Sequence, residues 1–304
     1  MSSSLPEGFH VRPVTAEDAA AVNELVVAVD TAVQGWSDST VAELVDWWRE
    51  TDLTTNSWVV EDDSVAAYAV VIPHGTTADI DGFVHPAKRG LGLGSWLLGR
   101  GEERVRELGF SSVLTWCLAP DASARALFDS AGYREVRRFY RMLVEHEDVP
   151  PAAEWPEGFR VGTVEAGEER AFHSAIAEAF AEEWNFVAQP YEQWAARRVD
   201  VPDFDPTLWF IVRDREDEIA AVLRGEADRG GAGFVGAIGV LPPWRKQGLG
   251  LALLRHAFLD FHRRGQSRVA LGVDAQNPTG ATRLYERAGM HVAYEAVAFE
   301  KVLA

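Results

Sequence analysis

The sequence has a single cysteine, Cys117, among its 304 residues. One cysteine excludes a disulfide within the chain and any zinc site built from several thiolates. The eight histidines include no His-x-x-x-His pair, so we expect no metal site. Cys117 lies in an apolar run, which favours a buried strand residue over a catalytic nucleophile.

Long hydrophobic runs and positive charge are also scarce. The sequence has no apolar stretch of about 18–20 residues and no basic-then-apolar leader, which predicts a cytoplasmic protein without a membrane partner. The 29 Lys and Arg residues face 47 Asp and Glu residues, for a net charge of −18. We therefore expect no nucleic-acid partner, and any phosphate site has to be local.

What the chain does have is one glycine-rich segment that occurs twice, 156 residues apart when Gly92 and Gly248 are compared. The copies read Arg89-Gly90-Leu91-Gly92-Leu93-Gly94 and Arg245-Lys246-Gln247-Gly248-Leu249-Gly250. In each copy an apolar run typical of a strand comes before the turn, and an amphipathic segment typical of a helix follows. A helix start offers unpaired N–H groups and partial positive charge, and glycine lets a ligand approach closely, so both turns predict a phosphate site.

Two familiar phosphate motifs do not fit these turns. A Walker loop ends in Gly-Lys-Ser/Thr, which neither copy has. The dinucleotide fingerprint needs a third glycine where Leu253 stands. A strand-to-helix turn without any ligand remains the alternative.

The repeat extends beyond the turns. Pro6-Glu7-Gly8-Phe9 returns as Pro156-Glu157-Gly158-Phe159, and the helix-like segment 127–132 returns at 284–289. We therefore expect two tandem domains, residues 1–147 and 155–304, joined by a linker at 148–154. Each half has helices and antiparallel strands followed by strand-helix-strand-helix-strand, which predicts an α/β fold with a mixed, mostly antiparallel sheet flanked by helices.

At this point the motifs of the second half resemble the GNAT superfamily of acyl-CoA-dependent N-acyltransferases. They are Arg245-x-x-Gly248-x-Gly250, and Asn277 followed by Leu284-Tyr285-Glu286. The resemblance covers nearly the whole chain, and the tandem layout is similar to that of the mycothiol synthases. It implies two GNAT-like domains, a sheet that splays open beside each glycine turn, and acetyl-CoA as the co-substrate held in the gap.

The resemblance also implies which residues hold acetyl-CoA. The pantetheine arm would lie along the strand before the turn, and the backbone amides of the turn would bind the pyrophosphate. In the second half these residues are Ile238, Val240, Arg245, Lys246, Gln247, Gly248, Leu249, Gly250, Leu251 and Asn277. In the first half they are Val84, Arg89, Gly90, Gly92, Gly94 and Ser95.

The resemblance places Tyr285 near the thioester sulfur. A phenol with an ordinary pKa of ~10 suits protonation of a departing thiolate. A packed helix aromatic is the alternative. The first half has Phe128 at the matching position, so we expect that half to be non-catalytic or weak.

The sequence leaves the general base open. Many members of the superfamily carry a Glu on the strand before the turn, but residues 234–240 contain no ionisable side chain. Glu226 on a neighbouring strand and Glu182 and Glu183 on an acidic helix face are the candidates, with a solvated helix face as the alternative. In the first half, Asp79 and Asp81 point to one face of the equivalent strand, where a base could sit.

The acceptor is the least defined part. Trp184, Tyr191 and Phe204 lie in segments that we expect to line its pocket, where aromatic rings and acidic residues suit a cationic amine. The predicted reaction is direct transfer of an acetyl group to a primary amine of a small molecule, by a monomer or homodimer. The alternatives are acetylation of a small thiol precursor of the mycothiol type and a non-catalytic acyl-CoA-binding or sensing protein.

Overall fold

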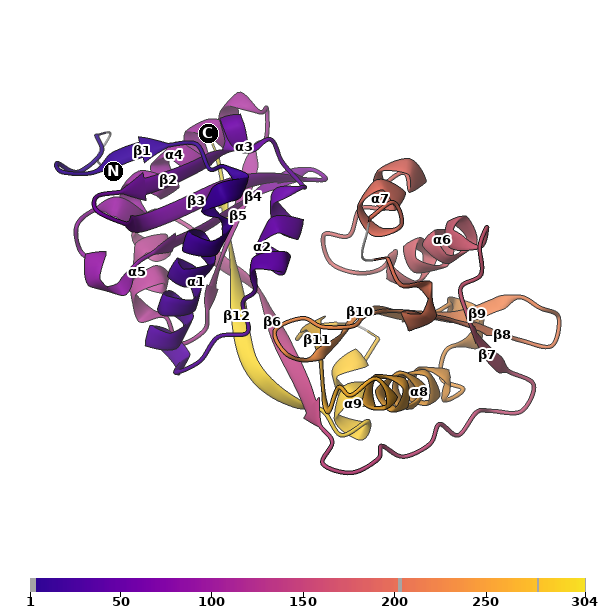
Figure 1. The fold of residues 1–304 in the computed structure, drawn as a ribbon. Coiled ribbons are helices and arrows are strands. Elements are labelled where there is room, and N and C mark those ends of the chain that lie inside the picture. The colour runs from indigo at the N-terminus through magenta and orange to yellow at the C-terminus, as the bar shows by residue number, and fades with distance from the viewer. Residues whose placement is uncertain (1–3, 202–203, 278, 304) are drawn as a thin grey trace. The chain divides into compact units, whose positions relative to one another are not determined.

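The chain forms two compact units in the computed structural model, which describes residues 4–201, 204–277 and 279–303. Unit 1 comprises Met1–Phe139 and Glu295–Ala304, and unit 2 comprises Tyr140–Tyr294. Each unit is a mixed sheet flanked by helices, so the α/β prediction with two tandem domains is confirmed (Figure 1).

Unit 1 carries its strands in the order β1-β2-β3-β4-β5-β12. Helices α1 and α2 pack on one face of the sheet through Val59, Tyr68 and Val70, and α4 packs on the other face through Ala67 and Ala69. The strands are β1 (His10–Arg12), β2 (Ser57–Glu61), β3 (Val65–His74), β4 (Thr77–Val84), β5 (Ser112–Leu118) and part of β12 (His291–Val302). The helices are α1 (Ala19–Gln34), α2 (Val41–Trp48), α3 (Leu53–Asn56), α4 (Leu93–Glu107) and α5 (Ala122–Ser130).

Unit 2 repeats this plan with the strand order β7-β8-β9-β10-β11-β6. Helices α6 and α7 cover one face of its sheet, and α8 and α9 cover the other (Figure 1). The strands are β7 (Arg160–Thr163), β8 (Trp209–Arg213), β9 (Ile219–Glu226), β10 (Gly233–Val240), β11 (Arg268–Asp274) and part of β6 (Arg134–Glu145). The helices are α6 (Glu169–Phe180), α7 (Tyr191–Arg198), α8 (Leu249–Arg263) and α9 (Ala281–Arg287).

The last strand of each sequence repeat contributes to both units. Strand β12 begins in unit 2, but its residues Ala296–Val302 pair antiparallel with β5 and complete the sheet of unit 1. Figure 1 shows this yellow strand among the purple strands of unit 1. Strand β6 begins in unit 1, and its residues from Tyr140 onward belong to unit 2. The boundaries of the two units therefore differ from the expected domain ranges, 1–147 and 155–304.

The hydrogen-bonded pairing next to each glycine turn stops partway along the strand. Strands β4 and β5 pair in parallel only from Ala78 to Ile80 on the β4 side. Strands β10 and β11 pair only from Gly233 to Val235 on the β10 side. The remainders of β4 and β10 stay paired with β3 and β9, so each sheet splays open on one side directly before its turn.

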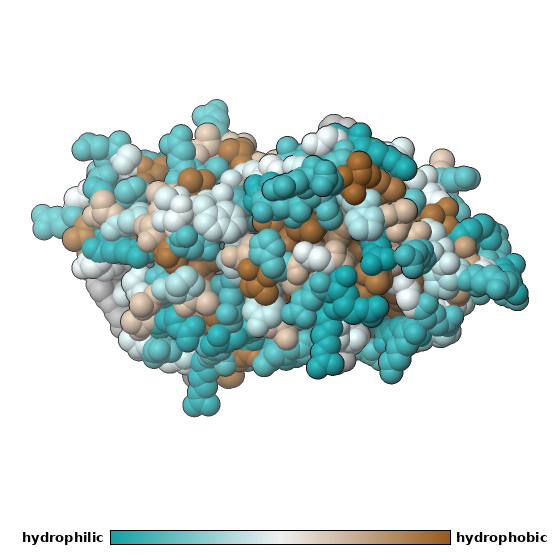
Figure 2. Space-filling model, turned by 90° about the horizontal axis from the view of Figure 1, so that it is seen from below, coloured by the Kyte–Doolittle hydropathy of each residue, from teal (hydrophilic) through white to brown (hydrophobic). Residues whose placement is uncertain are grey.

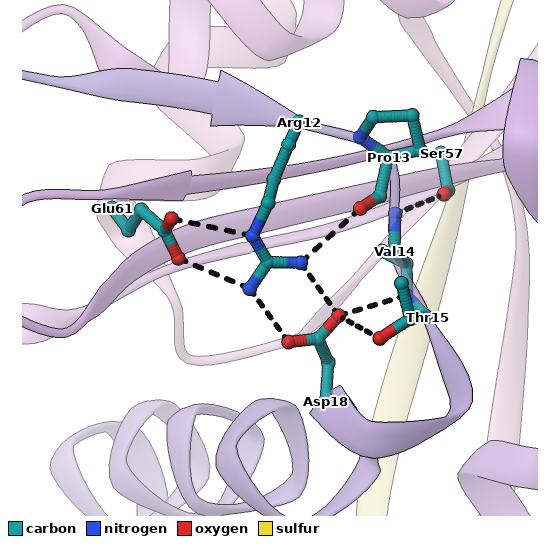
Figure 3. A network of polar contacts seen from close by, with 7 residues as sticks. All are labelled: Arg12, Pro13, Val14, Thr15, Asp18, Ser57 and Glu61. Carbon is teal, nitrogen blue, oxygen red and sulfur yellow. Dashed lines mark hydrogen bonds and ion pairs between the residues drawn. The ribbon is translucent and has the colours of Figure 1, made fainter.

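A charged network holds the start of α1 against the sheet of unit 1 (Figure 3). Arg12 of β1 donates two hydrogen bonds of 2.7 Å to Asp18, and two of 3.1 and 3.2 Å to Glu61 of β2. Asp18 also accepts from the backbone N–H of Thr15 at 2.8 Å. The Arg12 bonds, the Thr15 bonds and the attraction to Arg12 hold the pKa of Asp18 at about 2, although burial opposes them. The network therefore fixes the position of α1, which carries Asp30 near its other end.

Hydrophilic side chains are spread over the face drawn in Figure 2, and hydrophobic residues occur among them in separate patches. This agrees with the excess of acidic residues in the sequence. Among the residues that the structure describes, no helix is both long and apolar enough to cross a membrane.

Candidate functional site

The two glycine turns have the same backbone conformation. Gly92 and Gly248 are the N-cap residues of α4 and α8, with φ of 88° and 91°. Two residues earlier, Gly90 and Lys246 also have positive φ, 79° and 64°. A glycine N-cap has no side chain to accept hydrogen bonds from the helix start, so the first N–H groups of α4 and α8 are left for a ligand. Both turns are therefore suited to an anion such as a pyrophosphate.

The last glycine of each turn, Gly94 or Gly250, serves helix packing. A Cβ on Gly250 would lie 2.9 Å from Leu284 of α9, and a Cβ on Gly94 would lie 3.1 Å from Leu127 of α5. These distances are shorter than ordinary carbon contacts. Glycine at these two positions lets the helices approach each other, which is a different reason from the close approach of phosphate expected from the sequence.

The arginine of each turn is held by protein groups. Arg245 donates to the carbonyl of Val240 at 3.2 Å, to Glu182 at 2.7 Å and to the carbonyl of Ala179 at 3.4 Å. It therefore ties the end of α6 to the end of β10. Arg89 instead donates to Asp121 at 3.1 Å, the residue that caps α5. Both contribute positive charge near the turn, but their donors are already used at least in part.

Three predicted residues of unit 2 come together beside the turn. The side-chain amide of Asn277 donates to Glu183 at 2.6 Å, and its oxygen accepts from the N–H of Thr279 at 2.8 Å. Burial raises the pKa of Glu183, and the charges of Asp274 and Glu182 add to this effect. Tyr285 of α9 is only 6% exposed. Burial first, and then the negative charge of Glu183, raise the pKa of its phenol.

The other two candidates for the base are engaged elsewhere. Glu226 accepts from Arg224 and lies 3.2 Å from Arg229. The side chain of Glu182 is 63% exposed and is paired with Arg245. Glu183, which is half-buried and bonded to Asn277, is thus the candidate that forms no ion pair or hydrogen bond with an arginine among the described residues.

The remaining cofactor residues of unit 2 surround the turn. Ile238 and Val240 are half-buried and lie on the part of β10 that has lost its partner β11. Gln247 is exposed in the turn, Leu249 is buried at the start of α8, and Leu251 is half-buried in the first turn of that helix.

The predicted aromatic residues of the acceptor pocket lie mainly in a ring cluster. The ring of Tyr191 lies 4.0 Å from the Arg170 guanidinium and 6.0 Å from the ring of Trp194. Phe204 packs edge-on against Trp209 at 5.0 Å. Trp184 is half-buried in the turn that follows α6, directly after Glu183. Their role in binding an acceptor stays a prediction.

Unit 1 contains a pocket of about 370 Å³ in the splayed part of its sheet. It runs from the glycine turn, past the free end of β4, to α1. All six residues predicted to hold CoA in the first half line it: Val84, Arg89, Gly90, Gly92, Gly94 and Ser95. Phe128 lines it at the position that matches Tyr285.

Asp30 of α1 also lines this pocket, together with other residues that no sequence motif marks. Helical periodicity shows only that Asp30 lies on a helix, and no local motif marks it. Cys117 also lines the pocket, and burial raises the pKa of its thiol to about 12. At neutral pH the thiol is protonated and a poor nucleophile, which agrees with the strand role expected for Cys117.

The model of the acetyltransferase (GNAT) family matches residues 22–133 and 170–290, one match in each repeat. A mycothiol acetyltransferase of Thermobispora bispora is 33% identical over 238 residues, which cover 75% of this chain and 77% of that protein. A mycothiol acetyltransferase of Clavibacter sepedonicus is 30% identical over 251 residues, covering 79% of this chain and 78% of that protein.

Solved structures show the same architecture. The crystal structure of a GCN5-related N-acetyltransferase from Sphaerobacter thermophilus matches with a TM-score of 0.86 and 34% identity, covering 98% of this chain and 97% of that one. A tandem GNAT protein from the clavulanic acid biosynthesis pathway matches with a TM-score of 0.74 and 17% identity, covering 97% of this chain and 98% of that one. The second likeness concerns the fold alone.

Proposed function

Because this chain belongs to the GNAT family of acetyltransferases, we propose that unit 2 transfers an acetyl group from acetyl-CoA directly to a primary amine. One observation carries the assignment to unit 2. The side-chain amide of Asn277 donates to the carboxylate of Glu183, and the charge of Glu183 adds to burial in raising the pKa of the Tyr285 phenol. Unit 1 has Phe128 in place of the phenol.

The residues around the turn of unit 2 fit acetyl-CoA as a co-substrate. The N–H groups at the start of α8 would hold the pyrophosphate. Along Ile238 to Val240, the backbone on the side that has lost β11 is available to pair with the extended pantetheine arm, as an added strand would. The thioester of the co-substrate supplies the activated acetyl group.

In this assignment Glu183 takes the proton of the incoming ammonium. Its raised pKa brings the carboxyl closer to the operating pH, where a general base works best. The amine then attacks the thioester carbon, the carbon–sulfur bond breaks, and the electron pair leaves with the CoA thiolate. Aligning amine and thioester removes much of the entropic barrier.

Tyr285 protonates the departing thiolate. The negative charge of Glu183 is one cause of the raised phenol pKa, so a phenol next to an ionised Glu183 holds its proton firmly. Once Glu183 has taken the proton of the ammonium, this repulsion disappears and Tyr285 becomes a better donor. The two groups therefore act in sequence, and the phenol is restored by the second proton of the amine nitrogen, which the product gives up as it becomes a neutral amide.

The test is acetyl transfer by Glu183→Gln and Tyr285→Phe, measured against a panel of primary amines. We expect Glu183→Gln to lower kcat by roughly 100-fold or more and to remove the acidic limb of the pH–rate profile. We expect Tyr285→Phe to lower kcat with little change in the KM for acetyl-CoA. Glu178→Gln, an exposed residue of α6, the helix that ends three residues before Glu183, is the matched control. Full activity of Glu183→Gln would exclude this residue as the base.

A second candidate acceptor is a small thiol precursor of the mycothiol type. The relatives that bear the name mycothiol acetyltransferase, at 30 and 33% identity, favour it. The same assay with such a precursor tests this candidate. A positive result is a thiol-containing product that carries the acetyl group on its nitrogen.

A further inference from the structure

One arginine of unit 2, Arg224 of β9, projects from the sheet face that α6 and α7 cover. A Cβ on Gly225 would lie 3.1 Å from the ring of Phe261 in α8, so Gly225 faces α8. Because side chains alternate along a strand, Arg224 projects from the opposite face. Its cross-strand neighbour on β8 is Trp209, whose ring stacks on Phe172 of α6 at 4.9 Å.

Arg224 lies between two parts of the candidate site. On one side, Trp209 contacts Phe204, a residue predicted to line the acceptor pocket, at 5.0 Å. On the other side is β10, whose pairing with β11 ends at Val235. A Cβ on Gly236, the next residue, would lie 2.6 Å from the Cζ atom of Arg224. The guanidinium therefore covers the first residue of β10 that has lost its partner strand.

The reacting end of acetyl-CoA would lie at this place. In the proposed function the pyrophosphate is held at the start of α8, and the pantetheine arm runs back along β10 from Val240 toward Ile238. The thioester is at the far end of that arm, so it approaches Gly236 and the guanidinium that covers it. An amine that attacks the thioester comes equally close to Arg224.

The guanidinium of Arg224 has donors to spare. Its Nη1 donates to Glu226, and this side chain forms no other hydrogen bond within residues 4–201, 204–277 and 279–303. Nε and Nη2 donate side by side along one edge of the planar group, the arrangement that binds both oxygens of a carboxylate. The side chain is only 14% exposed. Water therefore competes less for these donors than it does at the protein surface.

The partner of Arg224 is shared with a second arginine. The carboxylate of Glu226 also lies 3.2 Å from Nε of Arg229, so it serves two guanidiniums. Burial lowers the pKa of the Arg224 guanidinium; the charge of Glu226 opposes this effect, and the charges of Arg198 and Arg229 add to it. A second carboxylate beside Arg224 would relieve the cost of enclosing this charge.

The matching position of unit 1 has no guanidinium. Ala237 and Asp81 stand at the same place, each three residues before the last residue of its strand. The cross-strand partner of Ala237 is Arg224, whereas that of Asp81 is Val70. Arg224 is therefore a property of the unit assigned to acetyl transfer and not a requirement of the repeated fold.

We propose, on the basis of the transfer proposed for unit 2, that Arg224 binds a carboxylate of the acceptor through Nε and Nη2. The acceptor is then a small amine of the amino-acid type, which carries a carboxylate as well as the ammonium group that Glu183 deprotonates. The free edge of the guanidinium supplies two donors, which match the two oxygens of a carboxylate. The third oxygen of a phosphate would find no donor on that edge.

The test is calorimetric titration of the full chain, with CoA present, with straight-chain amino carboxylates of three to six carbons and with alkylamines of equal length. We expect at least one amino carboxylate to bind roughly tenfold or more tightly than its alkylamine. Arg224→Met should remove this difference and leave the binding of the alkylamine unchanged. Arg215→Met is the matched control, because Arg215 also pairs with one glutamate, Glu157, but its side chain is 65% exposed.

A second variant guards against a folding defect. Arg224→Lys keeps a positive charge beside Glu226 but loses the paired donors. It should unfold at the same temperature as the unchanged chain and still bind the amino carboxylate more weakly. Unchanged affinity in Arg224→Lys would show that the paired donors are not used, and would overturn the proposal.

Acetyl transfer to the same compounds separates this proposal from the function on which it rests. Arg224→Met should raise the KM for the amino carboxylate roughly tenfold or more, with little change in kcat. Arg224-dependent binding without transfer by any variant would contradict the proposed function alone. The carboxylate proposal is overturned if no amino carboxylate binds more tightly than its alkylamine, or if Arg224→Met binds as Arg215→Met does. Equal slowing of transfer to both kinds of acceptor would also overturn it, because the guanidinium would then act on the thioester.

Discussion

Asp81 is the residue whose ionisation most clearly opposes the stability of the folded protein. Its pKa is raised from the ordinary 3.8 to about 7 in the folded protein, so the folded state favours the neutral carboxyl. The stability that this group contributes is complete below pH 4 and is lost as the pH rises through 7. An ionised carboxylate at this position therefore costs the protein stability above neutral pH.

From this we predict that Asp81→Asn stabilises the free protein at pH 8 and has little effect at pH 4.5. A shift of about three pKa units corresponds to roughly 2–4 kcal/mol of unfolding free energy, shared with the coupled Asp79. Thermal unfolding at the two pH values measures the difference. Asp63→Asn, a change at an exposed residue of unit 1, should give the same shift, near zero, at both. Equal effects of Asp81→Asn at pH 4.5 and 8 would contradict the raised pKa.

Individual residues also show how much of the candidate site can be predicted from the sequence. Asn277 and Tyr285 follow from a motif, and Glu183 was one of three candidates for the base. Choosing among them needs the contact between Glu183 and Asn277, which joins segments far apart in the chain. Asp30 could not be predicted as a pocket residue, because its place there comes only from the packing of α1 over β4.

At the scale of elements, the glycine turns combine two requirements. The first and second positions set the left-handed backbone that opens the helix start, and the third sets the distance to the next helix. In the first position, Lys246 shows that a side chain is tolerated with positive φ. At the third position, a methyl group would have to displace the end of the Leu127 or Leu284 side chain.

We therefore predict that Gly250→Ala destabilises the protein by about 1–3 kcal/mol, because its methyl group would lie 2.9 Å from Leu284. Gly99→Ala is the control. It lies within α4 with no atom in reach of the new methyl group, so it should be neutral or stabilising by up to about 1 kcal/mol. Denaturant unfolding of both variants gives the comparison. An unchanged midpoint for Gly250→Ala would show that α8 and α9 can separate freely.

Most element positions follow from local pattern. The strand expected before the second glycine turn, over residues 234–240, is β10, which begins one residue earlier, at Gly233. The last strand, β12, is long and runs from His291 to Val302. Its extent is set by partners in both units, which a local pattern does not record.

At the scale of the molecule, each sequence repeat ends in a strand whose last residues belong to the other unit: those of β6 to unit 2 and those of β12 to unit 1. Val297 and Phe299 of β12 are buried in the core of unit 1, where the ring of Phe299 lies 5.2 Å from that of Phe128. The polar, proline-bearing segment after β6 suggested a domain boundary in the sequence. Local composition does not record which sheet a strand joins. That depends on pairing between residues far apart in the chain, as between β12 and β5.

Deletion of residues 296–304 should therefore destabilise unit 1 more than unit 2, although these residues end the second repeat. The deletion removes the strand that covers β5 and the buried Val297 and Phe299. Hydrogen exchange followed segment by segment should show faster exchange in β4 and β5 and retained protection in β10 and β11. Equal loss in both units, or loss confined to unit 2, would contradict this division of the chain.

We propose that acetyl transfer takes place at the turn of unit 2. The most direct test compares the rate of acetyl transfer by Gly248→Trp with that by Gly92→Trp, two matched changes at the N-cap residues of α8 and α4. If unit 2 is the catalytic unit, Gly248→Trp lowers kcat/KM by roughly 100-fold or more. Gly92→Trp then leaves kcat/KM nearly unchanged. Loss of transfer in Gly92→Trp with normal transfer in Gly248→Trp would contradict it.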